Sequence, residues 1–127
     1  MAKTLVAITI DDLSVHAELN ESETASKIAS LLPLEGTANV WGYEIYFMVP
    51  LEMAAAPDAR SEVEVGELGY WPAGPAFCIF YGPTPVSTDD TPRAYSPVNV
   101  FGRVLGDATV LRGVENGAVV RVEQKGK

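Results

Sequence analysis

The sequence contains few of the residues that form reactive or cross-linked sites. Among its 127 residues there is one cysteine, Cys78, and one histidine, His16. A single cysteine permits no disulfide within the chain, and chains without disulfides are typical of reducing compartments, so we expect a cytoplasmic protein. A single histidine needs cysteine or carboxylate partners to bind zinc, and none lies at ligand spacing. Because no phosphate-binding loop or dinucleotide fingerprint occurs either, we expect no metal and no cofactor.

Positive charge and long apolar segments are also scarce. Nine lysine and arginine residues stand against 17 aspartate and glutamate residues, which gives a net charge of −8. Proteins that bind DNA or RNA need a cationic surface to displace counterions, so this balance argues against nucleic acid. No apolar run approaches the roughly 18 residues of a membrane span, and the opening residues do not resemble a signal peptide. We therefore expect no nucleic-acid and no membrane partner, and we attribute the acidity to solubility.

The remaining composition is that of a globular protein. Hydrophobic residues make up 47% and charged residues 20% of the chain, which is ordinary for a folded domain. At this length we expect one domain over residues 1–127, with roughly two-thirds of the unfolded surface buried on folding.

Short segments with strand character dominate the sequence. Residues 4–10 and 13–19 form a predicted hairpin, because both are rich in strand-forming residues and Asp11-Asp12 between them favours a turn. Further predicted strands cover residues 39–49 with an interruption at Gly42, 60–65, 76–81, 98–105 with a bulge at Gly102, and 118–123. About seven or eight short strands separated by turns are typical of a barrel or a sandwich.

One α-helix and one helical turn are predicted between the strands. We expect Asn20 to cap the helix, Glu23 to complete a capping box, and Pro33 to end it. Asp107 is expected to cap a single helical turn over residues 108–114. Glycine and proline predict turns or loops in two longer segments, residues 66–75 and residues 82–97.

Several motifs resemble those of the cyclophilins and their relatives. The sequence VNVFGRVL at residues 98–105, with the helical turn after it, is similar to a Val-Phe-Gly-Lys-Val strand and one-turn helix of cyclophilins. Other stretches resemble a family of small bacterial and archaeal cyclophilin-like proteins: VWGYEIYF at 40–47, GYWPAG at 69–74 and FYGPTP at 80–85. This resemblance covers nearly the whole chain. It implies a mainly β protein with a closed eight-stranded cyclophilin-like β-barrel, one α-helix and one short helical turn, but it brings no established activity.

The catalytic residues of cyclophilins are not matched. In cyclophilins an essential arginine lies on a strand of the Phe-His-Arg-Val type and hydrogen-bonds the substrate around the twisting imide bond. The corresponding region, residues 38–50, contains no arginine, lysine or histidine, and the cyclophilin Gln-Gly-Gly run is missing too. We therefore predict no catalytic residues. A weak prolyl isomerase, or an enzyme related to amide hydrolases, stays as the alternative to a binding protein.

Aromatic residues gather around turns that glycine and proline hold rigid. Residues 69–85, GYWPAGPAFCIFYGPTP, contain five of the eleven aromatic residues and four of the nine prolines. Aromatic side chains lose little entropy on binding, so Tyr70 and Trp71 suit the role of ligand anchors. The alternative for Trp71 is that its ring plugs one end of a barrel.

Three polar or reactive side chains lie within apolar segments. Inside an apolar pocket, Glu44 would have a raised pKa and could bind a cationic or hydrogen-bonding group, whereas strand alternation alone would turn it toward water. Asn99 lies between two valines and would serve either a structural network or a ligand. Cys78 in the charge-free run AFCIFY is typical of a small buried hydrophobe and not of a nucleophile.

These observations lead to a hypothesis of ligand binding. We predict a groove for a small molecule or a short peptide, with the loop at residues 82–97 as its rim. The predicted ligand-binding residues are Trp41, Glu44, Tyr46, Tyr70, Trp71, Phe80 and Asn99. A homodimer interface formed by the same aromatic residues is the structural alternative.

Overall fold

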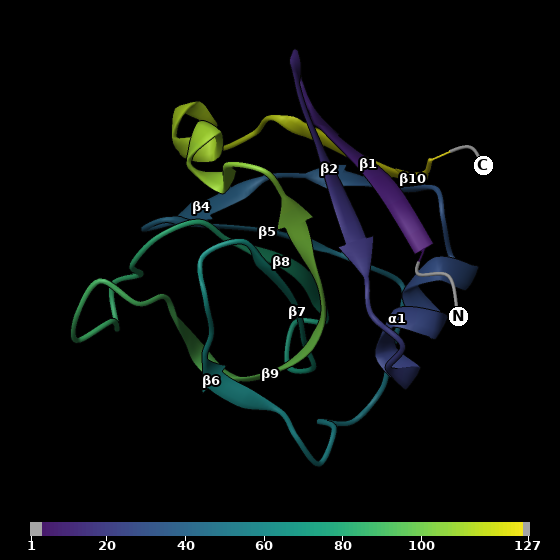
Figure 1. The fold of residues 1–127 in the computed structure, drawn as a ribbon, viewed down its shortest axis with the longest axis horizontal. Helices are drawn as coiled ribbons and strands as arrows, with labels where there is room; N and C mark the ends of the chain where they lie inside the picture. The colour runs from purple at the N-terminus through teal and green to yellow at the C-terminus, as the bar shows by residue number, and fades with distance from the viewer. Residues whose placement is uncertain (1–3, 126–127) are drawn as a thin grey trace.

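The computed structural model describes residues 4–125, which form a mainly β protein (Figure 1). Its strands are β1 (Thr4–Ile10), β2 (Leu13–Leu19), β3 (Leu34–Thr37), β4 (Asn39–Trp41), β5 (Glu44–Met48), β6 (Arg60–Glu62), β7 (Glu67–Trp71), β8 (Ala76–Phe80), β9 (Arg93–Leu105) and β10 (Val119–Gln124). The helical segments are the α-helix α1 (Glu23–Ser30) and the 3-10 helix η1 (Ala108–Gly113). Within the described residues, no helix has the length and apolar character that a membrane crossing requires.

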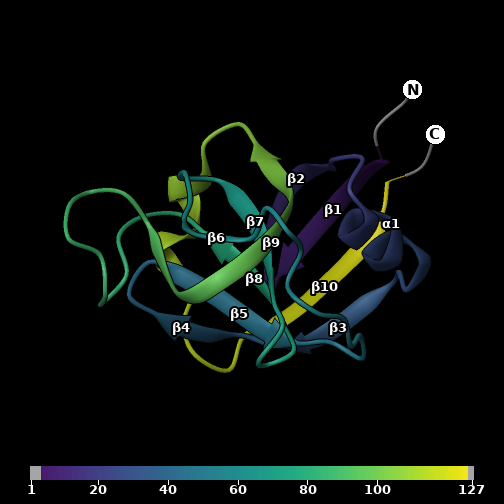
Figure 2. The same ribbon diagram turned by 90° about the horizontal axis from the view of Figure 1, so that it is seen from below.

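The strands form one curved sheet that does not close. Its order is β3-β10-β1-β2-β9-β7-β8-β5-β4, and β6 pairs with β9 beside this path. The sheet bends until its two edge strands, β3 and β4, lie along the same side of the molecule (Figure 2). The prediction of a closed eight-stranded barrel is therefore wrong, because the described residues form a ten-stranded sheet with two free edges.

The two edge strands follow each other directly in the chain. A single residue, Ala38, separates β3 from β4, so the two strands cannot fold back on each other as a hairpin. Its N–H donates to the carbonyl of Ala118 at 2.8 Å, and its carbonyl accepts from the N–H of Gly117 at 2.9 Å. The backbone of Ala38 is thus bound to the turn before β10.

The predicted first hairpin and the predicted helical turn are both confirmed. β1 pairs with β2 in register from Thr4↔Leu19 to Ile10↔Leu13. In the turn, Asp11 adopts a φ of 52°, a left-handed conformation that aspartate tolerates better than most residues. Asp107 caps η1, because its carboxylate accepts the N–H of Thr109 at 2.9 Å.

The cap of α1 differs from the prediction. Ser22 is the capping residue, and its Oγ accepts the N–H of Ala25 at 3.1 Å. Asn20 lies further from the helix: its Oδ1 accepts the N–H of Ser22 at 3.0 Å, and its Nδ2 donates to the carbonyl of Val100 at 3.1 Å. Asn20 therefore connects the approach to the helix with β9.

Two strands, β3 and β7, lie where the sequence predicted none, and β9 begins at Arg93 inside the predicted loop. β7 pairs with β8 on one side and β9 on the other, and such pairing overrides a local preference for turns. Its Gly69 serves close packing, since a Cβ there would lie 2.7 Å from Cγ2 of Val98. Glycine in this stretch thus marks a close approach between strands.

The sheet has a main core on its inner side and a smaller cluster on its outer side. The charge-free strand β8 contributes to both, because its side chains alternate. Phe77 and Ile79 belong to the main core, whereas Cys78 and Phe80 join the outer cluster. β9 contributes Val98 to that outer cluster. The candidate site lies at this outer cluster.

Candidate functional site

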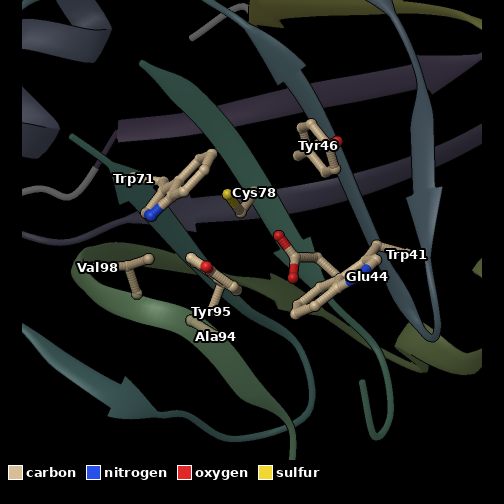
Figure 3. A pocket seen from close by; sticks show the side chains of 8 residues that line it. All are labelled: Trp41, Glu44, Tyr46, Trp71, Cys78, Ala94, Tyr95 and Val98. Carbon is tan, nitrogen blue, oxygen red and sulfur yellow. The ribbon is translucent and has the colours of Figure 1, made fainter. Parts of the chain in front are cut away.

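A pocket of about 250 Å³ opens on the outer side of the sheet (Figure 3). The hairpin of β4 and β5 provides one side, β8 and the end of β7 provide the floor, and the first half of β9 provides the opposite side. Its lining residues are Trp41, Glu44, Tyr46, Trp71, Cys78, Ala94, Tyr95 and Val98.

The turn between β4 and β5 places two of these residues side by side. Trp41 and Glu44 are register partners on either side of the turn. Gly42 in that turn adopts a φ of 60°, which glycine adopts without steric cost. A Cβ on Gly42 would also lie 2.8 Å from Cδ of Pro85, so the loop after β8 packs directly against the turn.

The carboxyl group of Glu44 is buried in an apolar setting. The residue is 5% exposed, and its Oε1 makes no hydrogen bond to any described residue. Burial raises the pKa of Glu44 to about 7, and a hydrogen bond with the Cys78 thiol offsets part of that rise. Figure 3 shows the carboxyl group directed into the space between Trp41, Tyr95 and Cys78. It can thus carry a proton or a negative charge near neutral pH.

Cys78 is held as a neutral thiol beside this carboxyl group. Its side chain is 1% exposed, and burial together with the Glu44 carboxylate raises its pKa well above the ordinary value. A nucleophilic cysteine needs the opposite environment, one that is accessible and favours the thiolate. Cys78 therefore contributes shape and a weak hydrogen bond to the pocket.

Three aromatic rings form the walls around the carboxyl group. The ring of Tyr95 meets that of Trp41 edge-on, with centroids 6.3 Å apart, and that of Trp71 edge-on at 6.2 Å. The indole Nε1–H of Trp71 donates to Oγ of Ser96 at 2.6 Å, which ties the end of β7 to β9. Tyr95 itself is 73% exposed. The walls are thus fixed on the Trp71 side and open to solvent at Tyr95.

Four of the predicted ligand-binding residues line this pocket, and the other three lie elsewhere. Trp41, Glu44, Tyr46 and Trp71 are in the lining. Phe80 is fully buried in the outer cluster.

Tyr70 and Asn99 are buried and hydrogen-bonded within the protein. The hydroxyl of Tyr70 donates to the carbonyl of Leu51 and accepts the N–H of Met53 at 3.2 Å, and its ring lies in the main core. Asn99 accepts the N–H of Ala56 at 2.7 Å and donates to Oγ1 of Thr24 and the carbonyl of Ala54, each at 3.2 Å. The Asn99 amide therefore serves a structural network, one of the two roles that the sequence left open.

The lining also contains four residues outside the predicted set: Cys78, Ala94, Tyr95 and Val98. Tyr95 lies in the segment predicted as the rim, and an isolated aromatic residue in a polar segment is the signal that could have identified it. Ala94 carries no such signal, because its place in the lining follows from the early start of β9. Val98 lies in the predicted strand, where it reads as an ordinary apolar residue.

A model of the family described as "Cyclophilin-like" matches residues 4–123 of the chain. The chain belongs to the cyclophilin-like family. A similar solved structure is the solution structure of a hypothetical protein from Archaeoglobus fulgidus, which is 35% identical. The likeness covers 98% of this chain and 96% of that one, with a TM-score of 0.81. No curated protein matches the chain.

The pocket of this cyclophilin-like protein has a distinct chemical character. None of its described lining residues is an arginine or a lysine, so it lacks the type of group with which cyclophilins bind the substrate imide. Across residues 4–125, histidine, cysteine, aspartate and glutamate form no group of three or more that could hold a metal ion. What the lining offers is one buried carboxyl group among aromatic and aliphatic side chains.

Proposed function

We propose that this cyclophilin-like protein is a binding module whose pocket holds a small molecule or one side chain of a short peptide. The observation that carries the proposal is the carboxyl group of Glu44, which lines an aromatic-walled pocket and whose Oε1 is buried without a hydrogen-bond partner among the described residues. Buried acceptors are nearly always satisfied in proteins, and those that are not often mark a site for a ligand or water.

The dimensions of the pocket favour a small occupant. A cavity of about 150 Å³ accommodates benzene, so a pocket of about 250 Å³ has room for a ring with a polar substituent. Sites of this kind combine apolar walls with a few well-placed polar groups, and the polar group here is Glu44.

The chemistry of the lining favours binding over catalysis. Cys78 is a neutral thiol, and its pKa is raised by burial, so it is a poor nucleophile. The single histidine, His16, lies on β2, where its Nε2 is 3.3 Å from Nζ of Lys125 and not beside the pocket. Cys78 and His16 are therefore not paired as the nucleophile and base of cysteine catalysis.

A fragment screen followed by nuclear magnetic resonance tests the proposal. We expect at least one neutral or charged fragment to shift the backbone amide signals of Glu44, Cys78 and Tyr95 together. Tyr95→Ser should weaken that fragment at least about tenfold, because Tyr95 is an exposed wall of the pocket whose loss leaves the core intact. Val119→Ser removes an exposed apolar side chain from β10 and is the control, with unchanged affinity expected. Fragments that shift only signals outside the pocket, or equal affinity in the Tyr95→Ser variant, would contradict the proposal.

A further inference from the structure

The unpaired carboxyl oxygen of Glu44 favours a ligand that carries a hydrogen-bond donor. Oε1 of Glu44 has no hydrogen-bond partner within residues 4–125, and its residue is 5% exposed, so bulk water has little access to it. Leaving a buried carboxyl oxygen unpaired is unfavourable, and a donor on a ligand would recover that free energy. The donor must approach through the pocket, because the carboxyl group is directed into it (Figure 3).

The walls favour a donor that also carries positive charge. Trp41, Trp71 and Tyr95 line the pocket, with Tyr95 in edge-on contact with each tryptophan. The faces of aromatic rings are electrostatically negative, and tryptophan and tyrosine attract ammonium and guanidinium groups placed over them. A carboxyl group surrounded by such rings is complementary to an organic cation.

Other classes of ligand fit the lining less well. An anion would find no lysine or arginine among the described lining residues and would approach a carboxyl group. A hard metal ion requires about six or more oxygen ligands, and Glu44 is the one carboxylate in the described lining. The net charge of −8 further favours cations around the whole molecule.

We propose, on the basis of the proposed binding function, that the ligand is a small organic cation. Its ammonium or guanidinium group donates an N–H to the carboxylate of Glu44 and packs against the rings of Trp41 and Tyr95. The pocket of about 250 Å³ leaves room for a ring or a short chain beside the cationic group. A free amine and the lysine or arginine side chain of a peptide share this chemistry.

The protonation of Glu44 gives the proposal a quantitative consequence. A cation binds the ionised carboxylate, and because burial sets the pKa of Glu44 at about 7, that form is a minority at pH 6 and a majority at pH 8. The titratable groups around it are Cys78 from β8, Tyr81 directly after β8, Tyr95 from β9 and Tyr46 from its own strand. Burial raises the pKa of Cys78 further from neutrality, so its thiol stays uncharged. Affinity should therefore rise about tenfold from pH 6 to pH 8, in proportion to the ionised fraction.

Titrations followed by calorimetry and by nuclear magnetic resonance, with matched probes, test the inference. The cationic probes are benzylammonium, n-butylammonium and N-acetyl-lysine methylamide. Benzyl alcohol and benzoate are the neutral and anionic counterparts of benzylammonium. We expect benzylammonium to bind at least about tenfold more tightly than benzyl alcohol at pH 8, and benzoate to show no binding. Tighter binding of the capped lysine would identify a peptide side chain as the source, and tighter binding of the simple amines would identify a free amine.

The variants separate the role of Glu44 from general effects of charge. Glu44→Gln keeps the shape of the side chain and removes its charge, so cation affinity should fall at least about tenfold and lose its dependence on pH. Glu52→Gln makes the same change at an exposed residue outside the pocket and should leave affinity unchanged. Tyr95→Ser is a second variant, at an exposed side chain, and should weaken the cationic probes more than benzyl alcohol.

The two proposals fail in different ways. Equal affinity for benzyl alcohol and benzylammonium, or cation affinity that is the same at pH 6 and pH 8, would overturn the cation inference and leave a pocket that binds neutral ligands. Failure of all three cationic probes at millimolar concentration, in a protein whose pocket binds neutral fragments, would also overturn it. Failure of every probe and every fragment would overturn the proposed function itself.

Discussion

Glu44 occupies a strand position whose neighbours across the sheet are apolar. It pairs with Phe80 on β8, and the next residue on the same side of β5, Tyr46, pairs with Cys78. The carboxyl group therefore lies over the outer cluster instead of in water, and this position raises its pKa to about 7 through burial. A protein that keeps a carboxyl group in such a place loses stability whenever the group is ionised.

The contribution of Glu44 to the stability of the protein should fall as pH rises past the ordinary pKa of a glutamate. Between the pKa of 4.5 for an unperturbed glutamate and about 7 in the folded protein, the folded state holds a proton that the unfolded chain has released. Rising pH thus favours unfolding across this window, and the loss levels off above it, at on the order of 3 kcal/mol in total.

Urea denaturation at about pH 4.5 and about pH 8 measures this effect. Glu44→Gln cannot titrate, so the free energy of unfolding of the wild type, relative to that of the variant, should be lower at the higher pH. Glu52→Gln is the control and should follow the wild type. A difference between wild type and Glu44→Gln that stays constant with pH would show that the carboxyl group is not held protonated.

Tyr70 and Trp71 show how far single residues can be placed from the sequence. The sequence predicts that both line the groove, because glycine and proline around them indicate a rigid turn that would present both rings to a ligand. They are consecutive residues of β7, however, and side chains alternate along a strand. Tyr70 is therefore turned into the main core, while Trp71 packs with the outer cluster and lines the pocket. Composition alone identifies the aromatic residues as candidate anchors. The side of the sheet on which each ring lies depends on the strand and its alternation of side chains.

At the scale of elements, Asn99 joins three parts of the fold. It lies on β9, donates to Thr24 of α1, and bonds the backbone of Ala54 and Ala56 in the segment before β6. These groups are buried or partly buried, so the amide satisfies them in place of water.

Asn99→Ala should destabilise the protein by about 1–3 kcal/mol, because it leaves these buried groups without partners. Chemical denaturation measures the loss, and amide hydrogen exchange at Ala56 should accelerate more than exchange in β1. Asn39→Ala, at an exposed residue, is the control and should change stability by less than about 0.5 kcal/mol. Wild-type stability in Asn99→Ala, or impaired binding of a pocket ligand without loss of stability, would contradict a structural role.

Element prediction succeeded where local signals agree with the pairing of strands. The hairpin of β1 and β2 is confirmed because alternation and its turn residues indicate the same structure. β7 was missed because its glycine and the prolines after it indicate turns, whereas its pairing with β8 and β9 depends on distant residues. The early start of β9 was missed for the same reason, since residues 93–97 carry no strand pattern of their own and this part of β9 pairs with β6.

At the scale of the whole molecule, the family was predicted correctly from motifs, but closure of the sheet was not. Whether a curved sheet closes depends on hydrogen bonds between its edge strands, and here β3 pairs with β10 and β4 pairs with β5, but β3 and β4 do not pair with each other. Hydrophobic periodicity predicts strands but carries no information on which of them pair at the edges of the sheet.

Membership of the cyclophilin-like family invites a test for prolyl isomerisation. We expect no acceleration in a protease-coupled proline peptide assay, because the described lining of the pocket offers no arginine to hydrogen-bond the twisting imide. The measured rate should equal the uncatalysed rate, and a known cyclophilin in the same assay provides the positive control. Acceleration that Tyr95→Ser abolishes would place an isomerase in this pocket and contradict the binding module.

Both tryptophans of the chain, Trp41 and Trp71, stand in the walls of the same pocket. Intrinsic fluorescence excited selectively at indole therefore originates entirely from the rings that a bound molecule would touch. A ligand that displaces water from between them should shift the emission maximum and change its quenching by acrylamide. The protein thus carries its own unlabelled optical reporter of occupancy.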